Sequence, residues 1–269
     1  MLKNRLIPII LTKNSLVVQS YKFSQYRPIG DIKTAIEFYV NWDVDEIIIV
    51  DIDASKEKRS LDTKILNWAV RECFVPITIG GGINSLTKIS SALRAGADKV
   101  CINSSFLESP KFIEKASAKF GSQCITISID AIKIRDGYKA YDYKTNSILD
   151  ITPYQLGKRA VELGAGEILL NSINNDGVGK GYDLSLLKSL TKKIKIPVIA
   201  CGGAGKFSHM SEAIKKGGCQ AIAASNIFVH SELSTIAAKA QLLRDGINVR
   251  LSSSVKYDEF EFDEFGRPY

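Results

Sequence analysis

The chain has 269 residues, of which 45% are hydrophobic and 24% charged, with 20 Gly and 7 Pro. This composition is typical of a globular protein and excludes a disordered, collagen-like or disulfide-rich scaffold. The apolar runs are far shorter than the roughly 18 residues of a membrane span, and residues 1–10 lack the apolar core of a secretion signal. We therefore expect a cytoplasmic protein with no membrane partner. The net charge of +7 is spread over many segments, so it does not favour nucleic-acid binding.

The cysteines do not have the spacing of a metal or redox site. They show no C-x-x-C pattern, and most lie inside apolar runs, where a reduced thiol behaves as a small hydrophobic side chain. The five are Cys73, Cys101, Cys124, Cys201 and Cys219. The sequence predicts no disulfide framework, no metal site and no cofactor.

Short runs of β-branched residues alternate with amphipathic segments along the chain. The runs predict strands at 6–10, 46–51, 75–79, 99–102, 124–130, 167–171, 197–201 and 221–224. The segments between them predict helices, among them 31–41, 61–73, 86–95 and 110–120. Strands that alternate with helices form parallel sheets, and eight such units match the size of a (β/α)8 TIM barrel. A doubly wound open sheet is the alternative.

An internal repeat favours a barrel built from two (βα)4 half-barrels. The segment Ile-Thr-Ile-Gly-Gly-Gly that follows Pro76 is echoed by Val-Ile-Ala-Cys-Gly-Gly after Pro197. Six pairs are separated by 121 positions: Pro76 and Pro197, Gly82 and Gly203, Gly96 and Gly217, Ser104 and Ser225, Glu46 and Glu167, and Asp62 and Asp183. A duplicated half explains this constant offset better than chance does.

The repeat places a glycine turn after one strand of each half, where a barrel has its active face. Glycine lets backbone N–H groups approach an anion closely, and the following helix start adds a hydroxyl and a positive helix end. The residues concerned are Gly81, Gly82, Asn103 and Ser104 in the first half, and Gly202, Gly203, Ala224 and Ser225 in the second. Two related half-sites predict a substrate phosphorylated at both ends.

The motifs of the chain, up to about residue 250, resemble those of the HisF family, the cyclase subunits of imidazole glycerol phosphate synthase. The segments that carry the resemblance are 77–83, 94–100, 102–104, 120–124, 129–131, 163–170, 176–177 and 199–205. The family resemblance implies a half-barrel duplication that binds a bisphosphorylated ribotide. It also implies ammonia supplied by a HisH-like glutaminase in a heterodimer, with imidazole glycerol phosphate and aminoimidazole carboxamide ribotide as products. Asp51, Asp176 and Gly177 join the expected substrate-binding residues through this resemblance.

The resemblance breaks at the catalytic pair. The family's chemistry uses two aspartates as general acid and base, and Asp130 matches the second of them. Leu11 occupies the first position, and its aliphatic side chain cannot transfer a proton. Further departures near the active face are Gln19, Asn171, Asn174, Asn175 and Val178. Efficient chemistry would need a substitute for the missing aspartate, such as Asp51, Asp53 or a water.

The residues that resemble the family's ammonia gate are all present. They are Arg5, Glu46, Lys99 and Glu167, each at the start of a predicted strand. Two acids and two bases at that end can pair across the N-terminal mouth, where a purely stabilising role is the alternative. The neighbouring Asp98 matches a family residue that meets the glutaminase.

These features leave two main hypotheses open. The first is a HisF-like synthase subunit with Asp130 as its acid/base and with activity reduced by Leu11. The second is an ammonia-channelling partner of a glutaminase and a sugar amidotransferase in surface-polysaccharide biosynthesis, without cyclase activity. A remnant that only binds a phosphorylated ligand is a third. We expect one domain over residues 1–250, followed by a flexible acidic and aromatic tail over 251–269.

Overall fold

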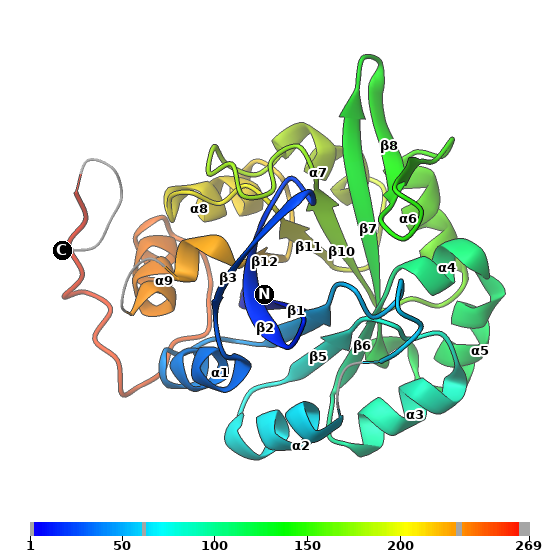
Figure 1. Ribbon diagram of the computed structural model, residues 1–269. Helices are drawn as coiled ribbons and strands as arrows, with labels where there is room; N and C mark the ends of the chain where they lie inside the picture. Colours follow the sequence, from blue (N-terminus) through cyan, green and yellow to red (C-terminus); the bar gives the residue numbers. More distant parts are fainter. Residues whose placement is uncertain (1–2, 61–62, 230–232, 264–269) are drawn as a thin grey trace.

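The computed structural model describes residues 3–60, 63–229 and 233–263, and in this part of the chain eight parallel strands form a closed barrel (Figure 1). In neighbour order the strands are β10 (Glu167–Ser172), β11 (Val198–Cys201), β12 (Ala221–Ala224), β1 (Arg5–Lys13), β4 (Ile47–Asp51), β5 (Ile77–Gly80), β6 (Lys99–Ile102) and β7 (Ile125–Ile134). β7 pairs in turn with β10 and closes the ring. The predicted (β/α)8 barrel is confirmed, and the open sheet is excluded because an open sheet keeps two unpaired edges.

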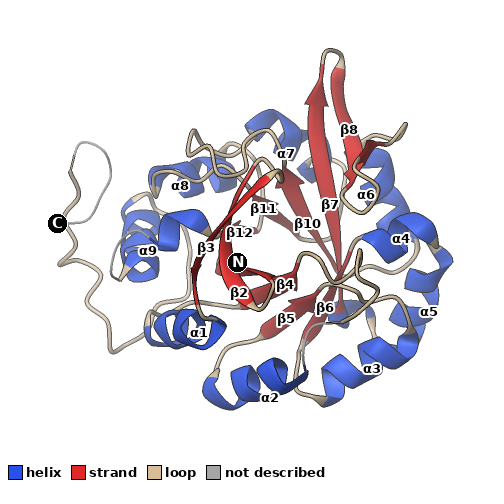
Figure 2. Ribbon diagram, viewed as in Figure 1, coloured by secondary structure: helices blue, strands red, loops and turns tan. Residues whose placement is uncertain are grey.

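Helices surround the strands on the outside (Figure 2). They are α1 (Ile32–Asn41), α2 (Thr63–Glu72), α3 (Leu86–Arg94), α4 (Ser104–Glu108), α5 (Lys111–Phe120), α6 (Pro153–Glu162), α7 (Leu184–Thr191), α8 (Ser208–Lys215) and α9 (Ser234–Arg244). The described residues also form two short 3₁₀ helices, η1 (Ser122–Cys124) and η2 (Asn226–Val229). Polar caps fix several starts: Asp31 accepts the Lys33 N–H at α1, and Ser85 accepts the Lys88 N–H at α3. The predicted helix 61–73 corresponds to α2, although residues 61–62, with the repeat position Asp62, lie outside the described residues.

The repeat of the sequence is visible in the backbone contacts of the glycine turns. A Cβ on Gly81 would lie 2.4 Å from the carbonyl oxygen of Asp51, and a Cβ on Gly202 would lie 2.8 Å from that of Ser172. Both pairs are related by the same offset of 121 positions. The two halves therefore make the same close approach between a glycine turn and the end of the preceding barrel strand.

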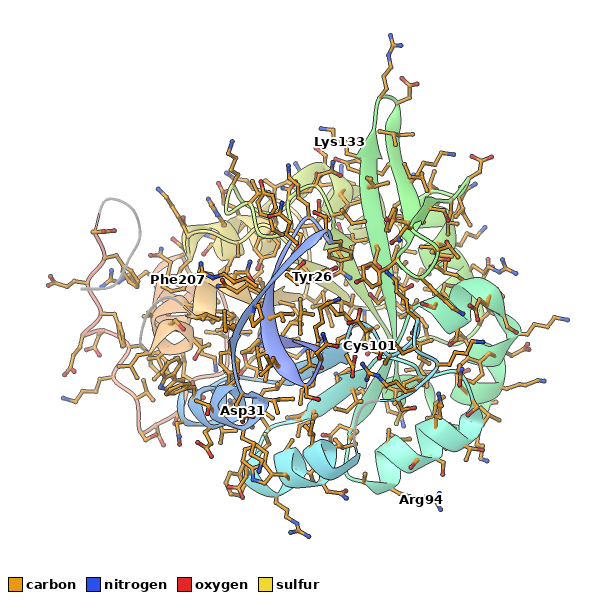
Figure 3. All side chains as sticks on the ribbon, viewed as in Figure 1. Tyr26, Asp31, Arg94, Cys101, Lys133 and Phe207 are labelled. Atoms are coloured by element: carbon orange, nitrogen blue, oxygen red, sulfur yellow. The ribbon has the colours of Figure 1, made fainter. Side chains whose placement is uncertain are left out.

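Two β hairpins that were not predicted from the sequence extend the barrel at the carboxyl ends of its strands. β2 (Leu16–Tyr21) and β3 (Gln25–Gly30) follow β1. Lys22 and Phe23 have positive φ in their turn, where glycine or asparagine is usual. The sequence therefore lacks the residues that signal such a turn. The other hairpin continues β7 into β8 (Gly137–Asp142), which pairs with β9 (Ser147–Ile148) and projects from the barrel with Lys133 on it (Figure 3).

Strand alternation divides the side chains into an outer core and a barrel interior. On β7, Ile125, Ile127 and Ile129 pack outward in the large core, so Thr126, Ser128 and Asp130 point inward. The middle of the interior is apolar. Its buried residues are Ile7, Ile9, Ile48, Cys101, Leu169, Ile199, Ala221 and Ala223. Cys101 lies within the ring of strands in Figure 3.

The segment after Val249 packs on the outside of α9. Tyr257 is buried against Ile236 and Ala240, and its hydroxyl bonds to Asp43. The domain boundary at residue 250 and the flexibility of the tail stay predictions, but this packing argues against a wholly free segment. Residues 264–269 lie outside the described residues. Within the described ranges, every helix is too short or too polar to span a membrane.

Candidate active site

The carboxyl ends of the barrel strands surround one cavity. Every residue predicted to act in catalysis or in substrate binding lines it, including Leu11 in the position of the missing aspartate. They are Leu11, Asp51, Gly81, Gly82, Asn103, Ser104, Asp130, Asp176, Gly177, Gly202, Gly203, Ala224 and Ser225. The structure thus brings these residues together, while their individual roles stay predictions.

Asp130 is a buried carboxyl group at the bottom of this cavity. β7 directs it inward, and two side-chain amides hold it: Asn171 Nδ2 lies 2.7 Å from Oδ1, and Asn103 Nδ2 lies 2.9 Å from Oδ2. Burial raises the pKa of Asp130 from 3.8 to about 6, although the two amides oppose this rise. A carboxyl group with this pKa can accept and return a proton near neutral pH, as general acid/base catalysis requires.

Leu11 leaves the opposite wall without a proton-transfer group. It lies on the inward face of β1 and packs on the apolar interior. The acids proposed as substitutes are held by cations: Arg59 Nη2 lies 3.1 Å from Oδ1 of Asp51, and Lys13 Nζ lies 3.0 Å from Oδ2 of Asp53. Both carboxylates are thus engaged in ion pairs, so neither is free to take the place of the missing aspartate.

Asp176 ties the β2–β3 hairpin over the mouth of the cavity. It accepts hydrogen bonds from Ser20 Oγ at 2.5 Å and from the Phe23 N–H at 3.3 Å. Asn226 Nδ2 donates to the Ser20 carbonyl oxygen from the segment that follows β12, the strand next to β1. Burial raises the pKa of Asp176, and the hydrogen bonds that its carboxylate accepts from Ser20 and Phe23 oppose the rise. The segments that follow β10 and β12, both in the second half of the barrel, therefore hold the hairpin over the cavity.

Aromatic side chains form the ceiling of the cavity. Phe23 and Tyr26 come from the hairpin, and Tyr143 comes from the turn after β8. Phe23 and Tyr143 meet edge to face with centroids 6.1 Å apart, and Lys56 Nζ lies 3.7 Å from the centre of the Tyr143 ring. Tyr26 lies on β3 in Figure 3. Three loops that follow different strands therefore meet above Asp130.

The opposite, N-terminal mouth is closed by a ring of alternating charges. Arg5 lies 2.8 Å from Glu46 and 2.5 Å from Glu167, and Lys99 lies 2.9 Å from each of the same two glutamates. Thr78 Oγ1 donates to Glu46 at 2.6 Å. Burial lowers the pKa of Arg5, but the two glutamates more than offset it, so that this pKa lies above its ordinary value. We call these four residues the charged ring.

Asp98 lies beside the charged ring on the loop between α3 and β6. Its Oδ2 accepts the Ile77 N–H at 2.8 Å, which anchors this loop to β5. The side chain is nevertheless exposed. Asp98 can therefore stabilise the loop and meet a partner with the same carboxylate.

A family model described as "Histidine biosynthesis protein" matches residues 5–234. The chain is 55% identical over 269 residues to the "Putative imidazole glycerol phosphate synthase subunit hisF2" of Vibrio vulnificus (strain YJ016), covering 100% of this chain and 99% of that protein. It is 44% identical over 217 residues to the imidazole glycerol phosphate synthase subunit HisF of Exiguobacterium sp. (strain ATCC BAA-1283 / AT1b), covering 80% of this chain and 85% of that protein. The chain belongs to the HisF family.

A relative from Campylobacter jejuni subsp. jejuni serotype O:2 (strain ATCC 700819 / NCTC 11168) carries the same name as the one from Vibrio. It is 44% identical over 251 residues, which cover 93% of this chain and all of that protein. The resemblance seen in the sequence is thus confirmed at the level of the HisF family. The departures from the family pattern at Leu11 and Gln19 stay predictions.

Several lining residues were not predicted from the sequence. Ser128 and Cys101 follow from alternation once Asp130 and Asn103 are placed on inward faces, and Cys201 follows from Ile199 in the same way. Phe23, Tyr26 and Tyr143 had no such signal, because their position depends on how the hairpins fold over the barrel. In the described ranges, no group of three or more His, Cys, Asp or Glu side chains is placed to hold a metal ion.

Proposed function

We propose that this chain is the synthase subunit of a glutamine amidotransferase. It takes ammonia from a HisH-like glutaminase and uses it on a bisphosphorylated ribotide, to give imidazole glycerol phosphate and aminoimidazole carboxamide ribotide. The observation that carries the proposal is the sequence of layers along the barrel. The charged ring, the apolar interior and the Asp130 cavity follow one another from the N-terminal to the C-terminal mouth.

Each layer suits one step of this function. An apolar interior admits neutral ammonia more readily than ammonium, because a buried cation without a counter-charge is costly. The glycine turns of the two halves lie on the wall of one cavity, which suits a substrate with a phosphate at either end. Asp130 then exchanges protons as nitrogen adds and the ring closes.

The charged ring must open for ammonia to enter. Lys99 bridges Glu46 and Glu167, so rotation of this one flexible side chain removes two of the four ion pairs. A glutaminase docked at this mouth, beside the exposed Asp98, would deliver ammonia to the ring without release to solvent.

The test is steady-state turnover of the bisphosphorylated ribotide with excess ammonium salt, which needs no glutaminase. We expect product from the unmodified chain and none from Asp130→Asn. Asp53→Asn is the matched control, because Asp53 pairs with Lys13 outside the cavity wall and should leave turnover largely intact. Equal turnover by Asp130→Asn and the unmodified chain would refute the role of Asp130.

Leu11 favours a second candidate function, in which the barrel passes ammonia to a sugar amidotransferase and performs no cyclisation. Its support is that the cavity wall opposite Asp130 is apolar and that Asp51 and Asp53 are ion-paired. This candidate predicts no turnover by the unmodified chain, turnover by Leu11→Asp, and a stable complex with a glutaminase. Absence of such a complex would exclude it.

A further inference from the structure

One inward-facing hydroxyl lies just inside the charged ring. Thr126 on β7 is 1% exposed and is paired in register with Cys101 of β6 and Glu167 of β10. Because Ile125 and Ile127 pack in the outer core, the side chain of Thr126 points into the barrel. It therefore lies where a molecule that has passed Glu167 enters the interior.

This hydroxyl has no hydrogen-bond partner within the described part of the chain. The comparable hydroxyl of Thr78 is satisfied, because it donates to Glu46 at 2.6 Å. Buried polar atoms in proteins are nearly always paired, and where the protein offers no partner a small molecule supplies one. An unpaired threonine at this position indicates such an occupant.

A second buried acceptor lies at the other end of the apolar interior. Asn103 gives its Nδ2 to Asp130, whereas its Oδ1 is buried without a partner among the described residues. In those ranges, Thr126 Oγ1 and Asn103 Oδ1 are the two buried side-chain atoms of this kind. Thr126 Oγ1 lies next to the charged ring, and Asn103 Oδ1 lies next to Asp130. The apolar interior, which includes Ile48 and Leu169, lies between them.

We propose that the Thr126 hydroxyl is a binding position for a small neutral hydrogen-bonding molecule, occupied by water at rest and by ammonia in transit. The hydroxyl can donate one hydrogen bond and accept others, which matches the lone pair and the N–H groups of ammonia. It carries no charge to compensate a cation, so it selects ammonia over ammonium. Asn103 Oδ1 then accepts a hydrogen bond from the same molecule beside Asp130. This inference rests on the proposed passage of ammonia through the barrel.

The first test does not depend on any enzyme activity. The thermal midpoint is measured at about pH 9.5 with rising ammonium chloride, at ionic strength kept constant with sodium chloride. Thr126→Val removes the hydroxyl at nearly constant shape, and Thr126→Ser keeps it. We expect free ammonia to raise the midpoint of the unmodified chain and of Thr126→Ser more than that of Thr126→Val, because a ligand that binds only the folded state stabilises it.

Water relaxation dispersion separates the two occupants. It counts long-lived buried waters, and we expect Thr126→Val to hold one fewer than the unmodified chain or Thr126→Ser. Loss of the water without any difference in the ammonia titration would mean that water alone binds, which overturns the ammonia part. Identical behaviour of Thr126→Val and the unmodified chain in both measurements overturns the whole inference.

The second test uses the complex with the glutaminase. Loss of one neutral hydrogen bond weakens the hold on ammonia about 2- to 13-fold. We therefore expect Thr126→Val to form less product per glutamate released, with Thr126→Ser restoring the ratio. If the unmodified complex forms no product at all, the proposed cyclase function fails, whereas the site at Thr126 is still decided by the titration and the water count.

Discussion

Replacement of Asp130 by Asn should stabilise the protein while it abolishes proton transfer. The folded state raises the pKa of this carboxyl from 3.8 to about 6, mainly by burial. Between these values the folded chain keeps a proton that the unfolded chain has lost, so its stability falls as pH rises through this window. Above about pH 6 the full penalty applies, and it amounts to about 3 kcal/mol.

Asn removes the ionisation but sacrifices one hydrogen bond. Its NH₂ group replaces one carboxylate oxygen, so either Asn103 or Asn171 loses an acceptor, at about 1 kcal/mol. The net gain for Asp130→Asn is then about 2 kcal/mol at pH 7.5, which corresponds to a rise in the thermal midpoint of about 4–8 °C. Near pH 4.5 the penalty in the unmodified chain falls to about 1 kcal/mol, so the two proteins should be nearly equal.

Urea unfolding at both pH values measures these differences. Asp150→Asn serves as the control, because the Asp150 side chain is exposed and its pair with Lys139 lies at the surface, so its loss should change stability little at either pH. A variant Asp130→Asn that is less stable than the unmodified chain at pH 7.5, or whose advantage is equal at the two pH values, would refute the electrostatic account of this site.

Three further predictions follow from the geometry. In the proposed role of Asp130 as a base, kcat/KM for the ribotide at a constant concentration of free ammonia should fall below about pH 6, and a pH profile that is flat from pH 5 to 8 would contradict this. Gly82→Ala should weaken phosphate binding, measured by calorimetry, and lower the thermal midpoint. The reason is that Gly82 has φ +67° and a Cβ there would lie 1.8 Å from the Arg59 carbonyl oxygen. Unchanged binding would show that this turn does not hold phosphate. Removal of residues 255–269 should cost about 1.5–3 kcal/mol of stability by urea unfolding, because Tyr257 is buried against α9, and no loss would mean that the tail is free.

Most of the barrel could be predicted from local sequence signals. Strand positions follow from β-branched runs, and the offset of 121 residues indicates the half-barrel repeat without any knowledge of contacts. The glycine turns are predictable from the same repeat. The structure gives the physical reason for Gly81, because a Cβ there would lie 2.4 Å from the carbonyl oxygen of Asp51.

The covering of the site could not be predicted in this way. The ceiling depends on Phe23 and Tyr143, which lie more than a hundred residues apart and meet only because two hairpins fold over one mouth. Likewise the ion pair of Lys13 with Asp53, which argues against Asp53 as a substitute for the missing aspartate, joins the end of β1 to the turn after β4. Long-range side-chain pairing of this kind leaves no local pattern.

The passage of ammonia from the charged ring to Asp130 is the central claim, and an isotope competition tests it most directly. The complex with its glutaminase is given glutamine labelled with ¹⁵N in the amide group, together with the bisphosphorylated ribotide and unlabelled ammonium in the medium. Passage through the barrel predicts that nearly all the nitrogen incorporated into the product is ¹⁵N and that Lys99→Ala, which opens two ion pairs of the ring, lowers this fraction. Product nitrogen that follows the isotope ratio of the medium would contradict the claim.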